Sequence, residues 1–277
     1  MPERDTRGRD SPVPRALTIA GSDSGGGAGI QADLKTFAIL GVWGTSAITS
    51  ITVQNTEGVT GVSDVAAPIV AAQIRAVATD IGVDAAKTGM LSSAGIIEAV
   101  AAAVEETGIR SLVVDPVFVS KHGHPLLSPD AVDAMRKRIV PLASVITPNL
   151  PEASGLAGFD VATKDDMARA AETILELGAR AVLVKGGHLE GSGSDDLFVA
   201  AGGSEWLTAE RIGSPHTHGT GCVLSSAIAA YLARGEDMVE AVRRGKEFVT
   251  EAIRHALHIG HGIGPVSPGW RLLEAVD

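Results

Sequence analysis

Short runs of apolar residues recur along the chain, separated by longer segments in which apolar and polar residues mix. Almost continuously apolar runs are typical of strands that are buried on both faces of a parallel sheet. The predicted strands are ALTIAG (16–21), TSAITSITVQ (45–54), VDAAKTG (83–89), SLVVDPV (111–117), SVITP (144–148) and AVLVKGG (181–187). Pro116 and Pro148 stop two of them, because proline has no N–H to donate to a neighbouring strand.

The segments between these strands show helical periodicity. In THGTGCVLSSAIAAYLARG (217–235), Leu224 and Ile228 belong to one apolar stripe, and Gly235 ends the helix. In TKDDMARAAETILELG (163–178), Thr163 is the predicted N-cap. The other predicted helices contain the stripe of Ile30, Leu34 and Phe37, or cover AAQIRAVATDIG (71–82) and AGIIEAVAAAVEETG (94–108).

Strands that alternate with helices predict a mostly parallel sheet covered on both faces, which is a three-layer α/β/α fold. With 277 residues and 45% hydrophobic content, one large core is the simplest organisation, so we expect residues 16–277 to form a single domain. Residues 1–15, MPERDTRGRDSPVPR, are charged and rich in proline and arginine, which predicts a disordered tail.

Composition and charge narrow the class of protein further. One cysteine cannot form an internal disulfide, and nothing resembles a signal peptide, so we expect a cytoplasmic protein. No segment approaches the roughly 20 apolar residues that span a bilayer. A net charge of −10 without a run of Lys or Arg argues against nucleic acid or an anionic membrane as a partner. Any anionic ligand therefore needs a local site.

Residues that can bind ligands cluster directly after the predicted strands, where open α/β sheets bind their ligands. They are residues 21–29, Gln54, Asn55, Asp115, Asn149, Glu152 and residues 185–188. The stretch GAGIQA matches the dinucleotide fingerprint in form. Gly27 stands six residues beyond Gly21, however, and no acidic residue ends the next strand, so we discount the match. A Walker A motif is also absent.

The single cysteine, Cys222, stands at the start of the helix that follows Gly219 and Gly221. The first N–H groups of a helix have no partner within it and create a positive local potential, so this turn is a candidate anion site. A thiol placed there is expected to have a lowered pKa. The alternative is that Cys222 is a small buried hydrophobic residue.

Seven motifs in a fixed order identify a family. AGSDSGGGAGIQADLKTF, TVQNTEGV, KTGML, VVDPV, ITPNLPEA, VLVKGGH and HGTGC resemble the hydroxymethylpyrimidine and phosphomethylpyrimidine kinases of thiamin biosynthesis, in the ribokinase superfamily. The resemblance runs from about Ala16 to Pro268, and QNT with HGTGC favours these enzymes over the related pyridoxal kinases. In two departures from the family, Trp43 replaces the usual Tyr, and VFVSKHG (117–123) brings Phe118 and His122 into the flap over the substrate.

The resemblance implies a small-molecule kinase that uses ATP and Mg²⁺. Phosphoryl transfer depends on donors and cations placed around the moving group. By resemblance, Gly219, Thr220, Gly221 and Cys222 supply N–H donors. Cys222 also occupies the position of the base that takes the proton from the acceptor hydroxyl.

The nucleotide and its metal are assigned to four residues by the same resemblance. Asn149 and Glu152 form the N-x-x-E motif that helps to hold Mg²⁺, and Asp115 is the other candidate metal ligand. Lys185 is expected to reach a nucleotide phosphate. The alternatives are a helix N-terminal carboxylate for Glu152, a turn residue for Asp115 and a solvated lysine for Lys185.

The substrate is expected among five residues. The carboxamide of Gln54 can pair with the ring nitrogen and amino group of an aminopyrimidine at once, the alternative being an exposed glutamine at a strand end. Gly21 allows the ring to approach the backbone. Met90 and Val53 are predicted neighbours, with core packing as the alternative for Val53. Asp33 is a candidate by motif position.

Five histidines are candidate ligands for a metal site. His255, His258 and His261 are spaced by three and are expected on a solvent-facing helical edge. No carboxylate or thiol completes a ligand set there, so we reject a metal site. His216 and His218 flank the anion loop and are expected to shape its turn.

The sequence therefore predicts a kinase that phosphorylates 4-amino-5-hydroxymethyl-2-methylpyrimidine and then the monophosphate, with Mg-ATP as the donor. Two alternatives stay open. One is pyridoxal or pyridoxine kinase activity on the same scaffold, and the other is a noncatalytic binder of pyrimidines or nucleotides. The family suggests a homodimer.

Overall fold

The computed structural model of the chain describes residues 13–118, 129–187, 189 and 193–273. A single sheet runs through this part of the molecule in the order β3-β2-β1-β4-β5-β6-β7-β8-β9. Its strands are β1 (Arg15–Asp23), β2 (Trp43–Gln54), β3 (Val59–Asp64), β4 (Ala85–Thr88), β5 (Leu112–Val114), β6 (Val145–Ile146), β7 (Ala181–Val184), β8 (Asp196–Ala200) and β9 (Gly203–Leu207). All six predicted strands are confirmed.

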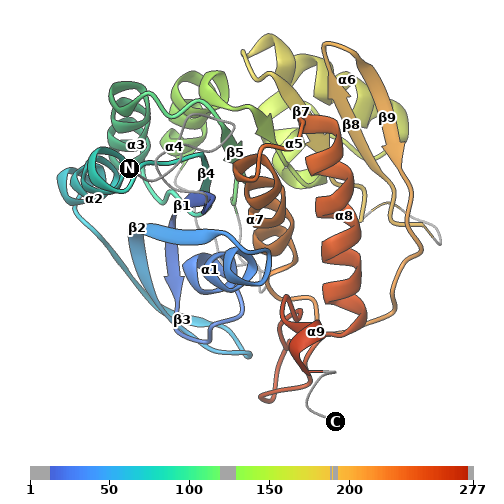
Figure 1. The fold of residues 1–277 in the computed structure, drawn as a ribbon. Helices are drawn as coiled ribbons and strands as arrows, with labels where there is room; N and C mark the ends of the chain where they lie inside the picture. Colours follow the sequence, from blue (N-terminus) through green and yellow to red (C-terminus); the bar gives the residue numbers. More distant parts are fainter. Residues whose placement is uncertain (1–12, 119–128, 188, 190–192, 274–277) are drawn as a thin grey trace.

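The sheet is parallel from β2 to β7, with antiparallel strands at both edges. Helices cover both faces, as Figure 1 shows, so the predicted three-layer α/β/α fold is confirmed. The helices are α1 (Gly29–Ile39), α2 (Ala67–Asp80), α3 (Ala94–Thr107), α4 (Pro129–Ala134), α5 (Leu150–Ala157), α6 (Lys164–Glu176), α7 (Thr220–Ala233), α8 (Met238–Arg254) and α9 (Trp270–Leu273), with a π-helix over Met135–Ile139 and a 3₁₀ turn over Val140–Leu142.

Two apolar cores lie on opposite faces of the sheet. One is formed with α2 to α6, and the other with α1, α7 and α8. In β5, Leu112 and Val114 point into the first core and Val113 into the second, which is the burial on both faces that a continuous apolar run predicts. No helix in the described part of the chain is long and apolar enough to cross a bilayer.

Local sequence signals set several helix ends. Thr163 and Asp166 form a reciprocal capping box at the start of α6, as the Thr163 cap predicts. Gly108 ends α3 in the left-handed conformation. The histidine prediction needs a correction, because α8 ends at Arg254 and the two histidines at 258 and 261 lie beyond the helix instead of on its edge.

The predicted boundary at the N-terminus also shifts. Arg15, placed in the tail by sequence, is the first residue of β1, and its guanidinium pairs with Asp84 at 3.2 Å. Residues 1–12 lie outside the described part of the chain. Because β1, β2 and β4 to β7 are parallel, their carboxyl ends meet at one edge of the sheet, and this edge holds the site.

Candidate active site

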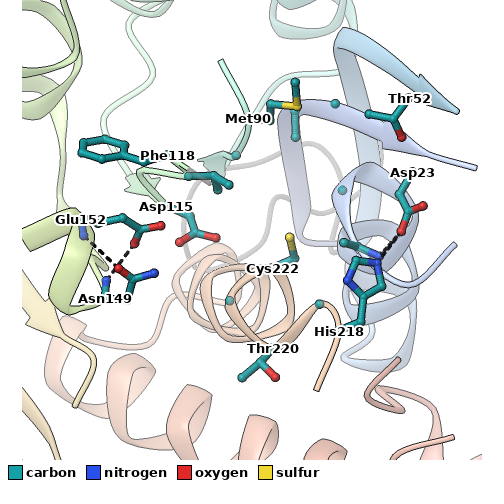
Figure 2. Close-up of a pocket in the computed structure, with 18 of the residues that line it drawn as sticks. Asp23, Thr52, Met90, Asp115, Phe118, Asn149, Glu152, His218, Thr220 and Cys222 are labelled. Carbon is teal, nitrogen blue, oxygen red and sulfur yellow. Dashed lines mark hydrogen bonds and ion pairs between the residues drawn. The ribbon is translucent and has the colours of Figure 1, made fainter. Parts of the chain in front are cut away.

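A cavity of about 480 Å³ lies at this edge, against the N-terminus of α7. Its walls come from the carboxyl ends of the parallel strands and from the loops that follow them. Eleven of the predicted site residues line it: Gly21, Gln54, Met90, Asp115, Asn149, Glu152, Lys185, Gly219, Thr220, Gly221 and Cys222. Figure 2 shows the Cys222 thiol pointing into this space, between Asp115 on one side and Asp23 with His218 on the other.

The anion loop has a backbone that only glycine can adopt at its first position. Gly219, the residue before α7, has φ of +83°, and a Cβ there would collide with the carbonyl oxygen of Gly27. The Thr220 hydroxyl donates to the carbonyl of Thr217 at 2.8 Å and so shapes the turn. The helix N-terminus that results faces the cavity, as the sequence predicts for an anion site.

The predicted lowering of the Cys222 pKa is wrong. Burial raises the pKa of the half-buried Cys222 thiol to about 11, the nearby Lys87 ammonium opposes this rise, and the carboxylates of Asp33 and Asp115 add to it. The backbone N–H of Gly29, at the start of α1, donates to the sulfur and also favours the thiolate. Sequence reasoning included the helix N-terminus but could not include desolvation by groups distant in the chain.

One end of the cavity carries charge. Lys185 places its Nζ 3.1 Å from Asp115 Oδ1 and 3.8 Å from Glu152 Oε2. Burial raises the pKa of Glu152 to about 7, the charge of Lys185 opposes the shift, and the charge of Asp115 adds to it. Lys185 is therefore part of a buried ion cluster, which rules out the alternative of a solvated lysine.

Glu152 is also a helix-capping residue. Its Oε2 accepts the backbone N–H of Asn149 at 2.8 Å, and Asn149 Oδ1 accepts the N–H of Glu152 at 2.9 Å. The backbone N–H of Phe118 donates to Glu152 as well. The Glu152 carboxylate therefore caps the start of α5 and also lines the cavity, and the capping box holds it rigidly.

The charged end suits a magnesium ion that is bound together with phosphates. Mg²⁺ is usually held by one or two protein carboxylates, water and substrate phosphates. Asp115 and Glu152 supply two carboxylates, and no larger group of metal-binding side chains occurs in the described residues. Because the charge of Asp115 helps to raise the pKa of Glu152, a cation at this end would relieve repulsion between them.

The opposite end of the cavity is polar and largely neutral. The Gln54 carboxamide contacts Thr52 Oγ1 at 3.0 Å and His218 Nε2 at 3.4 Å. His218 Nε2 lies 2.9 Å from Asp23 Oδ2, and Asp23 accepts N–H groups of the glycine loop. Met90 stands over Gly21, where a Cβ would lie 3.3 Å from its sulfur.

Two predicted substrate contacts are wrong. Val53 is 62% exposed and does not line the cavity, because alternation along β2 turns it to the side opposite Thr52 and Gln54. This exposure also excludes core packing. Asp33 is fully buried below the cavity, where it binds Lys87 instead of substrate.

Sequence reasoning did not assign Lys87, Thr52 or His218 to the site and included Asp23 only within the range 21–29, yet all four line the cavity. His218 was expected only to shape a turn, yet it is buried and joins the anion loop to the glycine loop through Asp23. A usable signal existed for Lys87, since a lysine inside a buried strand requires a partner.

The departures from the family pattern fall in different places. Trp43 begins β2, is 60% exposed and lies away from the cavity. Phe118 lines the cavity and packs on Gly155, where a Cβ would collide with its ring. His122 lies outside the described residues.

Comparison with known proteins gives a consistent result. The family model described as phosphomethylpyrimidine kinase matches residues 23–267. A hydroxymethylpyrimidine/phosphomethylpyrimidine kinase from Streptomyces coelicolor is 51% identical over 261 residues, covering 94% of this chain and 96% of that protein. A thiamine biosynthesis bifunctional protein from Geobacter sulfurreducens is 49% identical over 271 residues, covering 97% of this chain and 55% of that protein. The ADP complex of Bacillus subtilis pyridoxal kinase matches with a TM-score of 0.88 and 42% identity, covering 94% of this chain and 99% of that one.

Proposed function

The chain belongs to the phosphomethylpyrimidine kinase family, and we propose that the cavity at the N-terminus of α7 is its active site. The protein is an ATP-dependent kinase of thiamin biosynthesis that phosphorylates 4-amino-5-hydroxymethyl-2-methylpyrimidine and then its monophosphate. The observation that carries the assignment of the site is the placement of a neutral polar end, an anion loop and a charged end in one cavity.

The neutral end is the proposed place of the pyrimidine ring. Gln54 presents a donor and an acceptor side by side, which matches an amino group beside a ring nitrogen. The Thr52 hydroxyl donates to the carboxamide oxygen at 3.0 Å and so orients this side chain before the ring binds. Gly21 and Met90 line this end, and because Gly21 has no side chain the ring can approach its backbone.

The anion loop is the proposed place of the transferred phosphoryl group. The backbone N–H groups at 219–222 form the N-terminus of α7, and donors of this kind stabilise charge that develops during transfer. Lys185 and the two carboxylates at the charged end are the proposed site of the ATP phosphates and Mg²⁺, with Asn149 beside them. When bound, Mg²⁺ neutralises phosphate charge.

Cys222 lies between the two ends, where the acceptor hydroxyl has to lie if the ring is at Gln54 and the phosphoryl group at the anion loop. In the first phosphorylation the alcohol loses a proton as it attacks. We assign Cys222 as the group that receives this proton. Because burial raises the pKa of the thiol to about 11, the base form needs stabilisation by its surroundings.

Pyridoxal kinase activity is the second candidate, and the likeness to the Bacillus subtilis enzyme supports it. A coupled assay of ATP consumption with four acceptors tests the proposal: the pyrimidine alcohol, its monophosphate, pyridoxal and ribose. We expect turnover with the first two. Preference for pyridoxal would reassign the substrate, and ligand binding without turnover of any acceptor would favour a noncatalytic binder.

A second copy of the chain is the proposed partner. Three apolar side chains on β2 support this, because they lie outside the cavity and are 53–62% exposed. They are Trp43, Ile51 and Val53. The single cysteine, which cannot form an internal disulfide, supports a cytoplasmic location. Sedimentation of the full chain tests the homodimer.

A further inference from the structure

A buried ion pair lies directly under the floor of the cavity. Lys87, in β4, and Asp33, in α1, have no exposed side-chain surface, and Nζ lies 3.0 and 2.9 Å from the two carboxylate oxygens. Asp33 Oδ2 also accepts the Thr18 hydroxyl at 2.6 Å, and Oδ1 contacts the hydroxyl of Ser226. Both oxygens of Asp33 are therefore occupied, and Lys87 is held in one place.

This pair is connected to the single cysteine. Ser226 lies one helical turn after Cys222 in α7, and its Oγ is 2.6 Å from the Cys222 carbonyl oxygen as well as in contact with Asp33. Lys87 is buried but still forms part of the cavity wall. The charged groups that act most strongly on the Cys222 sulfur are Lys87 from β4, Asp33 from α1 and Asp115 after β5. Lys87 and Asp115 line the cavity together with Cys222.

We propose that Lys87, held by Asp33, supplies the positive charge that stabilises the Cys222 thiolate, and that it is a positioning residue for phosphorylation of the alcohol. The proposal rests on the proposed function of Cys222 as the proton acceptor. Among the charged groups that act most strongly on the sulfur, Lys87 is the cation, and the two carboxylates work against the thiolate.

Stability alone does not explain a buried pair in this position. Removing two charges from water costs several kcal/mol per ion, and apolar replacements of buried pairs are often neutral or stabilising. A charge that borders a reactive thiol has a use that an apolar residue cannot have. Asp33 helps to keep Lys87 protonated: burial lowers the pKa of Lys87, but the charge and hydrogen bond of Asp33, together with the charges of Cys222 and Asp115, raise it overall.

The single cysteine makes a direct test possible, because every thiol signal comes from Cys222. The rate of alkylation by iodoacetamide, measured on the full chain at pH 8 to 9.5 without substrates, follows the thiolate fraction. Loss of an adjacent opposite charge shifts a pKa by about 1 to 3 units. After allowing for the higher nucleophilicity of a more basic thiolate, Lys87→Met should slow alkylation about 4- to 50-fold.

Lys246→Met is the matched control. Lys246 forms a second buried pair, with Asp196 at 2.8 Å, and is not among the charged groups that act most strongly on Cys222. We expect wild-type alkylation in this variant. Wild-type alkylation in Lys87→Met, or equal slowing in both variants, would overturn the proposal.

Where Lys87→Met does not fold, the double variant Asp33→Asn/Lys87→Met should still react more slowly than wild type, because the effect of Lys87 on the thiol exceeds that of Asp33. A rate at or above wild type would overturn it there.

Kinetics on the two acceptors then separate this inference from the proposed function. In Lys87→Met, kcat for the alcohol should fall and its rise with pH should move to higher pH, while KM for ATP stays unchanged. If Lys87→Met is alkylated slowly but the wild type turns over no pyrimidine, the charge effect is retained and the proposed function is rejected. If Lys87→Met is alkylated at the normal rate and the wild type is active, only the role of Lys87 is rejected.

Discussion

Replacement of Cys222 by Ala should impair the first phosphorylation more than the second, by an amount that grows with pH. With the thiol pKa at about 11, roughly one thiol in a thousand is ionised at pH 8. General base catalysis contributes about 10²- to 10⁴-fold when the base is present. The product of these factors limits the loss in kcat for the alcohol to about tenfold at pH 8.

At pH 10 the thiolate fraction is about a hundred times larger than at pH 8, so the upper limit on the loss rises to about a thousandfold. The sign follows from the raised pKa, since the basic form is gained as pH rises toward 11. The monophosphate behaves differently. Its second pKa is about 6, so the attacking oxygen is already anionic and requires no base across this range.

The assay measures initial rates of ADP formation with each acceptor alone at saturation, from pH 7.5 to 10, for wild type, Cys222→Ala and Cys222→Ser. The serine variant keeps the size of the side chain but cannot ionise in this range, so it should match the alanine variant. The backbone donors of the anion loop persist in both variants. Equal losses with the two acceptors, or a loss that does not change with pH, would mean that Cys222 acts through packing.

Three further predictions concern the two ends of the cavity and the loop between them. Gln54→Ala should raise KM for the pyrimidine by about 10- to 100-fold, because leaving polar ring atoms unpaired costs ~1 to 3 kcal/mol, and it should leave KM for ATP unchanged. If steady-state kinetics show that both KM values shift together, the role of Gln54 is structural. Glu152→Gln should weaken the apparent Mg²⁺ affinity with pyrimidine binding intact, and an unchanged Mg²⁺ titration would remove Glu152 from the site. Gly219→Ala should destabilise the fold by about 1 to 3 kcal/mol or more and lower kcat, because its φ is +83°; wild-type Tm and kcat together would contradict this.

The parallel strands could be predicted from sequence because most of them are short, nearly continuous apolar runs. The antiparallel strands β3, β8 and β9 were not predicted. β3 reads VTGVSD and is mostly exposed, so no apolar pattern distinguishes it from a loop. Its pairing with β2 is a tertiary contact that no local signal in the strand records. The same limit applies to α8, whose end at Arg254 depends on contacts beyond the helix.

Residues of the site were found where a motif places them directly after a strand, as with Gln54 and Asp115. Orientation was harder to predict. Val53 and Gln54 are adjacent, yet only Gln54 lines the cavity, since successive residues of a strand face opposite sides. Asp33 was assigned by motif position, but its side chain faces Lys87 in the core. The pKa of Cys222 was missed for a related reason, because it depends on burial and on charged neighbours from α1, from β4 and from the loop after β5.

The order of groups along the cavity also bears on how one site can serve both steps. The neutral end at Gln54 and the charged end at Lys185 lie on either side of Cys222, so an acceptor alcohol between them is next to the thiol. In the proposed second step the attacking oxygen belongs to a phosphate and lies one phosphoryl group farther from the ring. That oxygen can then no longer occupy the position of the alcohol while the ring stays at Gln54. A base fixed at Cys222 therefore serves the first acceptor by position as well as by chemistry, and the second acceptor, already ionised, does not depend on it.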